Sequence, residues 1–394
     1  MDNTKQLNIE YFSLQSLFWM TYCMVVGFSV TYLLSCGYSN SEAGYILASA
    51  NICALILQPF FAELADRSKK INAMSIFFVS IAIIFVCSIG LFFIGIRSVI
   101  LTLIYVVMIT LANAVIAFLT SVQFLMDTSK SKINFGLCRA GGSLCFAILS
   151  AAMGILIEKI GMKSIPTALF IITLLIIVLC MYIIRHRIHT SERIINSSDN
   201  KRSSSLIVFF QENPKFMILS IAMLFIYYAH AFITNFTISI VRNVGGNHRE
   251  MGYLIAFMAL MELPGMIGFK EISRRFKVSS LLLFSMIMFS IKAIIVWLSP
   301  SLMTLTFGFA LQVVSFAIYI PASVQYANII IDEKDTVKAQ MMFNLMQAGG
   351  AVFSSIIGGW LIDFSGISHA LLVGAILSCI GTMIAFAGIQ NTKR

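Results

Sequence analysis

Long apolar segments alternate with short polar breaks along almost the whole chain. An α-helix that crosses a bilayer needs roughly 20 predominantly apolar residues, and dividing the chain at its breaks predicts twelve such helices. The first apolar run is far longer than that of a signal peptide, so we expect the first helix to be retained. The expected limits of the twelve helices are 10–36, 42–64, 72–95, 98–127, 135–158, 165–185, 214–241, 250–270, 279–299, 302–331, 337–363 and 368–390.

The longest polar stretch falls after the sixth predicted helix and divides this pattern in half. It runs from Arg185 to Pro214 and is rich in serine and basic residues, which is typical of a flexible linker. The sequence therefore predicts an all-α integral membrane protein in three parts. These are an N-terminal six-helix bundle over 1–186, a cytoplasmic linker over 187–213 and a C-terminal six-helix bundle over 214–394.

A weak internal repeat relates the fifth predicted helix to the eleventh. Similar segments of the two helices are Phe135-Gly136-Leu137-Cys138-Arg139-Ala140-Gly141-Gly142 and Asn344-Leu345-Met346-Gln347-Ala348-Gly349-Gly350. Repeats of this kind indicate two related halves, as in many transporters. Arg139 in the first copy corresponds to Gln347 in the second. An intramembrane charge is a functional hypothesis by default, so the position where the symmetry is broken is a candidate site.

The composition and the charge distribution support a membrane protein. The 394 residues are 59% hydrophobic and 11% charged, with a mean hydropathy of +0.92. Twenty basic residues fall on the side that holds both termini, against five on the other side, so the positive-inside rule predicts that both termini are cytoplasmic. The net charge of +10 is thus a topology signal, with anionic lipid as a secondary contact and no nucleic acid. We expect a multi-pass protein of a bacterial-type cytoplasmic (inner) membrane.

The sequence contains no pattern that predicts an enzyme, a metal site or a cofactor. It has no nucleophile elbow, P-loop, His-Glu metal motif or paired catalytic carboxylates. The eight cysteines lie in or beside apolar runs without the spacing of metal ligands, so we expect small interior residues rather than ligands or disulfides.

Three short motifs carry a resemblance to a known family. Twelve helices with a central linker resemble the major facilitator superfamily. That family has a signature loop between helices 2 and 3, and this chain has a similar segment there, Ala62-Glu63-Leu64-Ala65-Asp66-Arg67-Ser68-Lys69-Lys70. The resemblance implies a gating role for Asp66 and the adjacent Arg67; a solvated charge run is the alternative. Asn134-Phe135-Gly136 with Arg139, and Glu262-Leu263-Pro264, resemble the lactose permease group and its relatives, the oligosaccharide and nucleoside proton symporters.

Two cations remain after the loop residues have been assigned to the two sides of the membrane, Arg139 and Lys292. Glu262 is the acid placed firmly inside a predicted helix, with Asp127, near a helix end, as the next candidate. A cation at the centre of a helix facing lipid costs about 2.5 to 3.5 kcal/mol, so we expect these cations to face a hydrated cavity or a carboxylate. Guanidinium and carboxylate groups make directional hydrogen bonds to hydroxyls. Arg139 and Glu262 are therefore predicted to bind a polar substrate, and a structural ion pair that locks the closed state is the alternative.

The resemblance to the lactose permease group implies further site residues but also shows departures. Arg139 and Glu262 match the arginine and the helix 8 glutamate of the sugar site, while Phe146 replaces the stacking tryptophan and Gln123 the helix 4 glutamate. On the proton side, Lys292 replaces an arginine, and the helix 7 aspartate falls at His230. Gln312 and Ser315 replace the histidine and glutamate of helix 10. The departures leave galactoside specificity and the route of proton coupling open.

Polar residues at helical spacing add candidates. Gln340, Asn344 and Gln347 share one face of predicted helix 11, and Tyr227 shares a face with His230. Asn344, Gln347 and Tyr227 are predicted to bind substrate, with hydrogen bonding between helices as the alternative. The candidates for proton coupling are Glu262, His230, Lys292 and Asp127, since histidine titrates near neutrality and desolvation can make a glutamate titrate there.

The sequence as a whole predicts a monomeric importer that works by alternating access. The expected substrate is a polar small molecule, a sugar or oligosaccharide first, carried together with a proton. A nucleoside proton symporter is the next alternative, followed by an antiporter that exports drugs or sugars. A membrane sensor without transport is the last, and a linker of this length leaves little room for a signalling domain.

Overall fold

The computed structural model describes residues 3–67, 71–127, 132–187, 206–332 and 335–392, which are almost entirely helical and contain no strand. Ten of the described helices are long and apolar enough to cross a membrane, and two bent helix pairs bring the number to twelve if each pair is one span. The prediction of an all-α membrane protein is therefore confirmed. By their mutual contacts the residues form two units, which are described separately: Met1–Ser191 with Asn247–Ala259, and Glu192–Gly246 with Leu260–Arg394.

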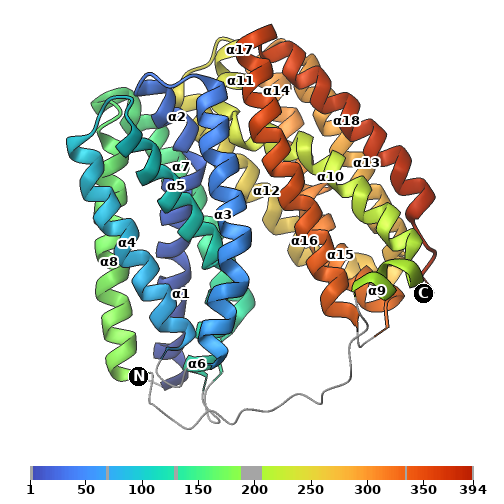
Figure 1. Ribbon diagram of the computed structural model, residues 1–394, viewed down its shortest axis with the longest axis horizontal. Helices are drawn as coiled ribbons and strands as arrows, with labels where there is room; N and C mark the ends of the chain where they lie inside the picture. The colour runs from blue at the N-terminus through green and yellow to red at the C-terminus, as the bar shows by residue number, and fades with distance from the viewer. Residues whose placement is uncertain (1–2, 68–70, 128–131, 188–205, 333–334, 393–394) are drawn as a thin grey trace. The chain divides into compact units, whose positions relative to one another are not determined.

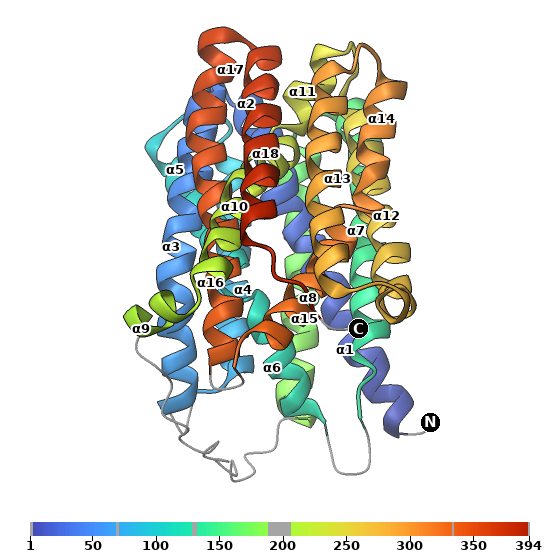
Figure 2. The ribbon, with the colours of Figure 1, turned by 90° about the vertical axis from the view of Figure 1, so that its right-hand side faces the viewer.

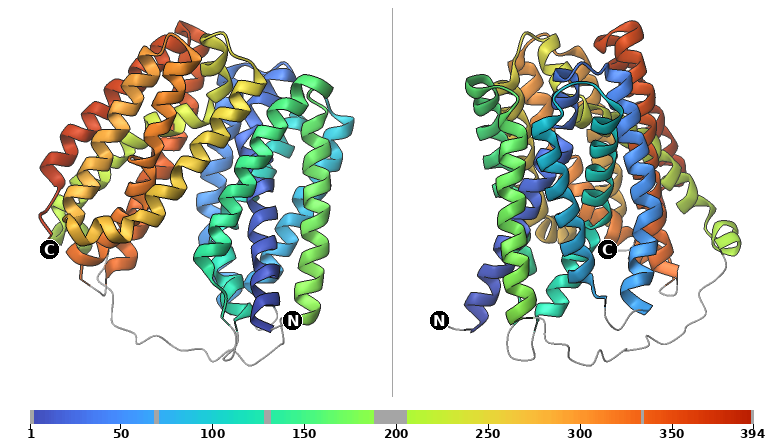
Figure 3. Two further views of the ribbon diagram at one scale, coloured as in Figure 1. Left: turned by 180° about the vertical axis from the view of Figure 1, so that it is seen from behind. Right: turned by 60° about the vertical axis from the view of Figure 1, so that its left-hand side comes forward.

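The first unit is a bundle in which α1 lies along α7, α3 along α5 and α4 along α8 (Figures 1 and 3). It also includes the first half of α12 (His248–Arg275). The other elements of this unit are α1 (Asn3–Tyr22), the π-helical turn η1 (Cys23–Gly27), α2 (Ser29–Ser35), α3 (Asn40–Arg67), α4 (Ala73–Phe93), α5 (Val99–Ala114), α6 (Ile116–Met126), α7 (Phe135–Ile160) and α8 (Ser164–His186).

Local sequence sets several helix ends in this unit. The side chains of Asn72, Ser98 and Asn134 accept hydrogen bonds from backbone N–H groups in the first turns of α4, α5 and α7, as capping residues do. Helix α7 stops at Gly161, whose φ of 89° lies in the left-handed region that favours glycine. The predicted boundaries of these helices are close to the observed ones for this reason.

Two spans of the first unit are bent rather than straight. The helices on either side of Phe28 meet at 43°, and those on either side of Val115 at 45°. The first bend follows the π-helical turn η1, and π-helical turns commonly redirect helices at functional sites. The second bend has no proline. The sequence predicts each of these spans as a single helix, and the structure adds the bends.

The second unit packs α10 against α18 and α16, and α13 against α18 and α15 (Figures 1 and 2). Its core is rich in aromatic side chains, among them Phe216 and Phe343, whose ring centroids are 4.8 Å apart. The elements are α9 (Leu206–Glu212), α10 (Pro214–Asn235), α11 (Thr237–Asn243), the second half of α12, α13 (Val278–Leu298), α14 (Leu302–Ala310), the 3₁₀ turn η2 (Leu311–Val313), α15 (Phe316–Ile330), α16 (Thr336–Phe353), the π-helical turn η4 (Ser354–Gly358), α17 (Gly359–Ser365) and α18 (Ile367–Gly388).

The observed division of the chain differs in two places from the one drawn on the sequence. Most of the predicted linker, residues 188–205, lies outside the described residues, and its last part forms α9. The segment Asn247–Ala259, which the sequence places in the second half, belongs by its contacts to the first unit. Helix α12 is therefore shared between the units, and Glu262 lies just beyond the point where it passes from one to the other.

A buried ion pair joins the first helix to the end of α8. The guanidinium of Arg187 donates two hydrogen bonds of 2.7 Å to the carboxylate of Glu10, and their side chains are only 17% and 8% exposed. Paired and bidentate geometry of this kind offsets the cost of burying both charges. Glu10 therefore has a structural partner, which argues against a use of this acid in coupling.

A Glu10→Gln variant is expected to lower the free energy of unfolding by about 3 kcal/mol, because it leaves a poorly hydrated cation with a weaker partner. The hydrogen bond to Glu10 raises the pKa of Arg187 above its ordinary value. The cation's contribution is therefore complete below its ordinary pKa and is lost only as the pH rises through the raised one. Thermal unfolding in detergent should show the same loss from about pH 6 to about pH 9.

Glu271→Gln is the matched control for this prediction. Glu271 pairs with Arg274 and Arg275, but its side chain is 59% exposed, and exposed pairs contribute little. Equal losses in the two variants would contradict the structural role of the buried pair.

Candidate functional site

An aromatic ring and a hydroxyl contact the intramembrane arginine of the first unit. The guanidinium carbon of Arg139, on α7, lies 4.0 Å from the centroid of the Trp19 ring on α1, a distance suited to a cation–π interaction. Nη1 of Arg139 donates a hydrogen bond of 2.8 Å to Oγ of Ser143, one helical turn further on. The guanidinium therefore has an aromatic face on one side and a hydroxyl at its edge. The sequence identifies Arg139 but not Trp19 or Ser143.

Two charged residues of the second unit, Lys292 and Glu262, are joined through a glutamine by hydrogen bonds. Nζ of Lys292, on α13, donates to Oε1 of Gln312 at 2.6 Å, and Nε2 of Gln312 donates to Oε1 of Glu262, on α12, at 2.9 Å. Lys292 and Gln312 are each 1% exposed, and the ammonium also lies 5.6 Å from the ring centroid of Phe309. One amide thus accepts from the buried cation and donates to the partly buried acid, which offsets the cost of burying the ammonium.

The backbone is irregular around Gln312, the middle member of this hydrogen-bonded chain. Gln312 lies in the 3₁₀ turn η2 between α14 and α15, and the cap of α15, Ser315, has φ and ψ of −89° and −87°. Gly265, one turn after Glu262 on α12, lies so close to the carbonyl of Val313 that a Cβ there would collide with it. Interrupted helices in transporters commonly mark substrate and ion sites.

His230 lies in an aromatic cage in the second unit. Its ring stacks on Phe316, with centroids 5.0 Å apart, and meets Phe289 and Tyr227 at 5.3 and 5.1 Å. The side chain is 7% exposed, and Nδ1 has no hydrogen-bond partner among the described residues. Phe289 is one turn from Lys292 on α13, so His230, on α10, packs against the helix that carries the lysine. The structure therefore places Tyr227, His230 and Lys292 in one region of the unit.

The remaining predicted substrate residues have different surroundings. Gln347 donates a hydrogen bond of 3.1 Å to the hydroxyl of the buried Tyr319, whereas Asn344 is exposed. Gln123 is buried on α6. Phe146 packs against a small cluster of alanines on α7 and the first half of α12. Of these four residues, Gln347 is the one whose side chain the structure fixes by a side-chain hydrogen bond.

The predicted gating and proton residues at the ends of α3 and α6 lie apart from these contacts. Asp66 is in the last turn of α3, but its side chain is outside the described part of the structure. Arg67 is exposed and pairs with Glu63 at 2.8 Å. Asp127, at the end of α6, accepts a hydrogen bond of 2.8 Å from the backbone N–H of Ile133, shortly before α7.

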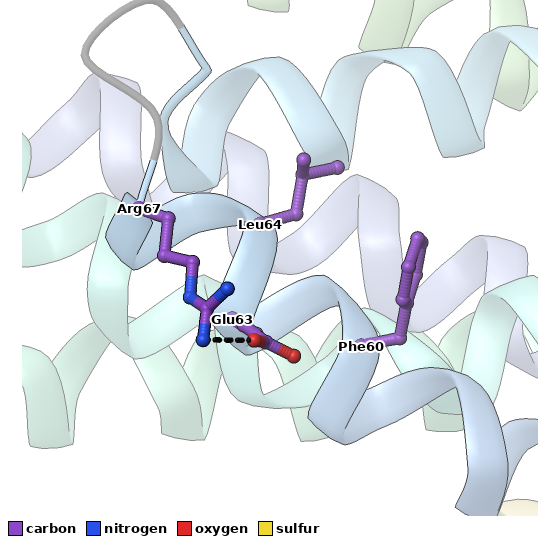
Figure 4. Close-up of a pocket in the computed structure, with 4 residues that line it drawn as sticks. All are labelled: Phe60, Glu63, Leu64 and Arg67. Atoms are coloured by element: carbon purple, nitrogen blue, oxygen red, sulfur yellow. Dashed lines mark ion pairs between the residues drawn. The ribbon is translucent and has the colours of Figure 1, made fainter.

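A pocket with a cavity volume of about 390 Å³ lies beside the end of α3, where the ion pair of Arg67 and Glu63 is drawn in Figure 4. Phe60 and Leu64 line it with these two charged residues, all from α3. The lining residues include none of the predicted substrate residues. The pocket therefore belongs to the signature-loop region and not to the contacts around Arg139 or Lys292.

Small residues in the first unit allow a close approach of α7 and the first half of α12. A Cβ on Gly252 would lie 2.6 Å from the carbonyl oxygen of Ser150, and one on Gly154 would lie 2.8 Å from that of His248. Oγ of Ser150 donates to the carbonyl of Gly252 at 3.2 Å. Glu158 and Arg249 form an ion pair of 2.8 Å nearby. The sequence alone does not indicate this contact between α7 and α12.

The fold and these buried charges define a membrane transporter built of apolar helices. The chain belongs to the major facilitator superfamily, since residues 7–373 match the family described as MFS_1 like family. The resemblance inferred from the signature loop and the central linker is thereby confirmed.

Two curated relatives are similar over most of their length. The maltose permease of Geobacillus stearothermophilus is 21% identical over 347 residues, which cover 88% of this chain and 85% of the relative. An uncharacterized transporter of Bacillus subtilis (strain 168), YwbF, is 25% identical over 361 residues, covering 87% and 83%.

Solved structures of transporters share the fold at low sequence identity. A mutant of the nucleoside transporter NupG has a TM-score of 0.79 and 14% identity, covering 98% of each chain. An auto-inhibited POT family peptide transporter has a TM-score of 0.76 and 9% identity, covering 97% of this chain and 96% of its own. At such low identities the similarity shows that the proteins share a fold, and it does not identify a substrate.

Proposed function

We propose that this protein imports a polar small molecule, a sugar or oligosaccharide, by proton symport and alternating access. The observation that carries the proposal is that the charged residues inside the helices have different contacts in the two units. The first holds Arg139 against an aromatic ring, and the second holds Glu262 and Lys292 in one hydrogen-bonded chain. Fixed donors beside an aromatic face suit a ring that carries hydroxyls. The protein is proposed to work as a monomer in the cytoplasmic (inner) membrane.

A sugar is the first choice for two reasons. The similarity to the maltose permease covers most of both proteins, and the contacts in the first unit suit a hydroxylated ring. Arg139 supplies N–H donors, and its contact with the Trp19 ring holds them in place. Lys292 and Gln312 are both buried, so the ammonium of Lys292 lies where water is scarce. Charges there interact more strongly than in water, which suits a group that must respond to a single proton.

Counterflow in proteoliposomes tests the substrate class. Vesicles preloaded with unlabelled maltose, a glucoside, uridine or a dipeptide would be diluted into the labelled form of the same compound. We expect a transient overshoot of label with maltose or the glucoside. Protein-free vesicles are the control. An overshoot with uridine alone would favour a nucleoside transporter, and no overshoot with any of the four would contradict the proposal.

Replacing the two groups proposed to carry the proton tests the coupling. A Glu262→Gln, His230→Asn double variant is expected to keep counterflow, which needs no net proton movement, and to lose uptake driven by a pH gradient. Both substitutions keep approximate shape and hydrogen-bonding capacity while removing the groups that can bind and release a proton. If uptake by the double variant kept its full dependence on the pH gradient, neither residue would be part of the proton path.

A further inference from the structure

Trp19 lies where it can fix the direction of the Arg139 guanidinium. The guanidinium carbon is 4.0 Å from the ring centroid, so the ring face covers one side of the cation. A guanidinium is planar and presents its donors in a rigid fork. Stacking therefore limits its rotation, and the hydrogen bond to Ser143 limits movement within the plane.

The indole is itself held in place by a chain of hydrogen bonds that leads to buried side chains. Nε1 of Trp19 donates to Oε1 of Gln15 at 3.0 Å, Nε2 of Gln15 donates to the hydroxyl of Tyr11 at 2.8 Å, and that hydroxyl donates to the carbonyl of Leu119 at 2.8 Å. Gln15 and Tyr11 are fully buried. The chain runs from α1 to α6, so the orientation of the indole is set by two helices other than the one that carries Arg139.

Helix α7 leaves space for the indole at one residue. A Cβ on Gly142 would lie 2.5 Å from Cδ1 of Trp19 and 3.4 Å from the carbonyl oxygen of Gln15. Any side chain at this position would displace the ring or separate the helices. A glycine three positions after Arg139 is thus required for the contact between the guanidinium and the ring. The segment Arg139-Ala140-Gly141-Gly142 therefore supplies both the cation and the space for the indole.

We propose that Trp19 is a positioning residue for substrate recognition, which holds the Arg139 guanidinium ready for the hydroxyls of a ring-shaped substrate before that substrate arrives. The proposal rests on the proposed function. A donor group ordered in advance loses less conformational freedom on binding. Trp19 should therefore affect the KM for transport much more than the maximal rate or the stability.

The first test is optical and needs no substrate. The protein has three tryptophans, so a Trp297→Phe, Trp360→Phe background leaves Trp19 as the only source of indole emission. We expect Arg139→Gln to change the intensity and position of this emission, whereas Arg274→Gln, at an exposed ion pair, should not. Identical emission in the two variants would show that the cation and the ring are not in contact, and would overturn the proposal.

The second test separates positioning from a structural role by comparing KM with the maximal rate. For maltose and uridine counterflow, we expect Trp19→Leu to raise KM roughly tenfold, within the range of a cation–π contact removed from water. Trp19→Phe, which keeps a ring face, should recover most of this loss. Gly142→Ala should reproduce the Trp19→Leu defect although Trp19 is present. Trp360→Leu is the control, because Trp360 is half-exposed on α17 and stacks on Phe364.

The outcomes distinguish this proposal from the proposed function. Normal counterflow by the wild type with an unchanged KM in Trp19→Leu would overturn the positioning role and leave the function intact. A lower maximal rate and lower thermal stability in both Trp19→Leu and Trp19→Phe, at constant KM, would show a structural role only and would also overturn it. Absence of wild-type counterflow for both compounds would reject the function, and the recognition role with it.

Discussion

A Gln312→Met variant is expected to lose transport and about 3 kcal/mol of stability. Gln312 accepts a hydrogen bond of 2.6 Å from Lys292 and donates one of 2.9 Å to Glu262. Methionine has a similar volume, but it neither accepts strongly from Lys292 nor donates to Glu262. Removing the shared partner of a buried cation and an acid costs the desolvation energy that the hydrogen bonds had offset. Thermal unfolding and counterflow on the same preparation would measure both effects.

Two further variants make this result specific. Gln340→Met removes a glutamine whose hydrogen bond to Asn328 is exposed, and it should leave the unfolding temperature almost unchanged. Adding Lys292→Met and Glu262→Gln to Gln312→Met removes the charges as well, and should recover stability without recovering coupled uptake. If Gln312→Met alone were as stable and as active as the wild type, the hydrogen-bonded chain would have no role.

An Arg139→Lys variant is expected to raise the KM of the transported substrate at least tenfold, about 1.4 kcal/mol of binding energy. Lysine keeps the positive charge but loses the planar fork and its stacking on Trp19, which the 4.0 Å separation makes possible. Counterflow over a range of substrate concentrations would provide the measurement.

Arg274→Lys is the matched control, since this arginine is 66% exposed and pairs with Glu271 on the same helix. Its KM should remain that of the wild type. Undiminished substrate binding in Arg139→Lys would remove Arg139 from the recognition site and leave it as a structural cation.

Much of the fold could be predicted because hydrophobic length and turn chemistry are local properties. The span that contains Arg139 was expected over 135–158 and is observed as Phe135–Ile160, bounded by Asn134 and Gly161. The bend at Val115 could not be predicted, because no proline lies beside it and it depends on packing. The assignment of Asn247–Ala259 to the first unit likewise depends on contacts distant in sequence.

The candidate site was predictable where the cost of burying charge identifies a residue. Arg139, Lys292 and Glu262 are conspicuous in apolar helices for that reason. Their partners Trp19 and Gln312 are not, because an aromatic ring or an amide in a helix becomes informative only when its neighbours are known. The resemblance identifies Gln312 as the replacement of the helix 10 histidine. The structure adds that it connects the cation to the acid.

The most direct test of proton-coupled import is accumulation of the labelled compound that shows counterflow, in proteoliposomes with an imposed inward proton gradient. Proton symport predicts that the wild type concentrates the compound above its external level, that a protonophore abolishes the accumulation, and that Glu262→Gln only equilibrates it. Accumulation that persisted with the protonophore, or that Glu262→Gln retained in full, would contradict the account.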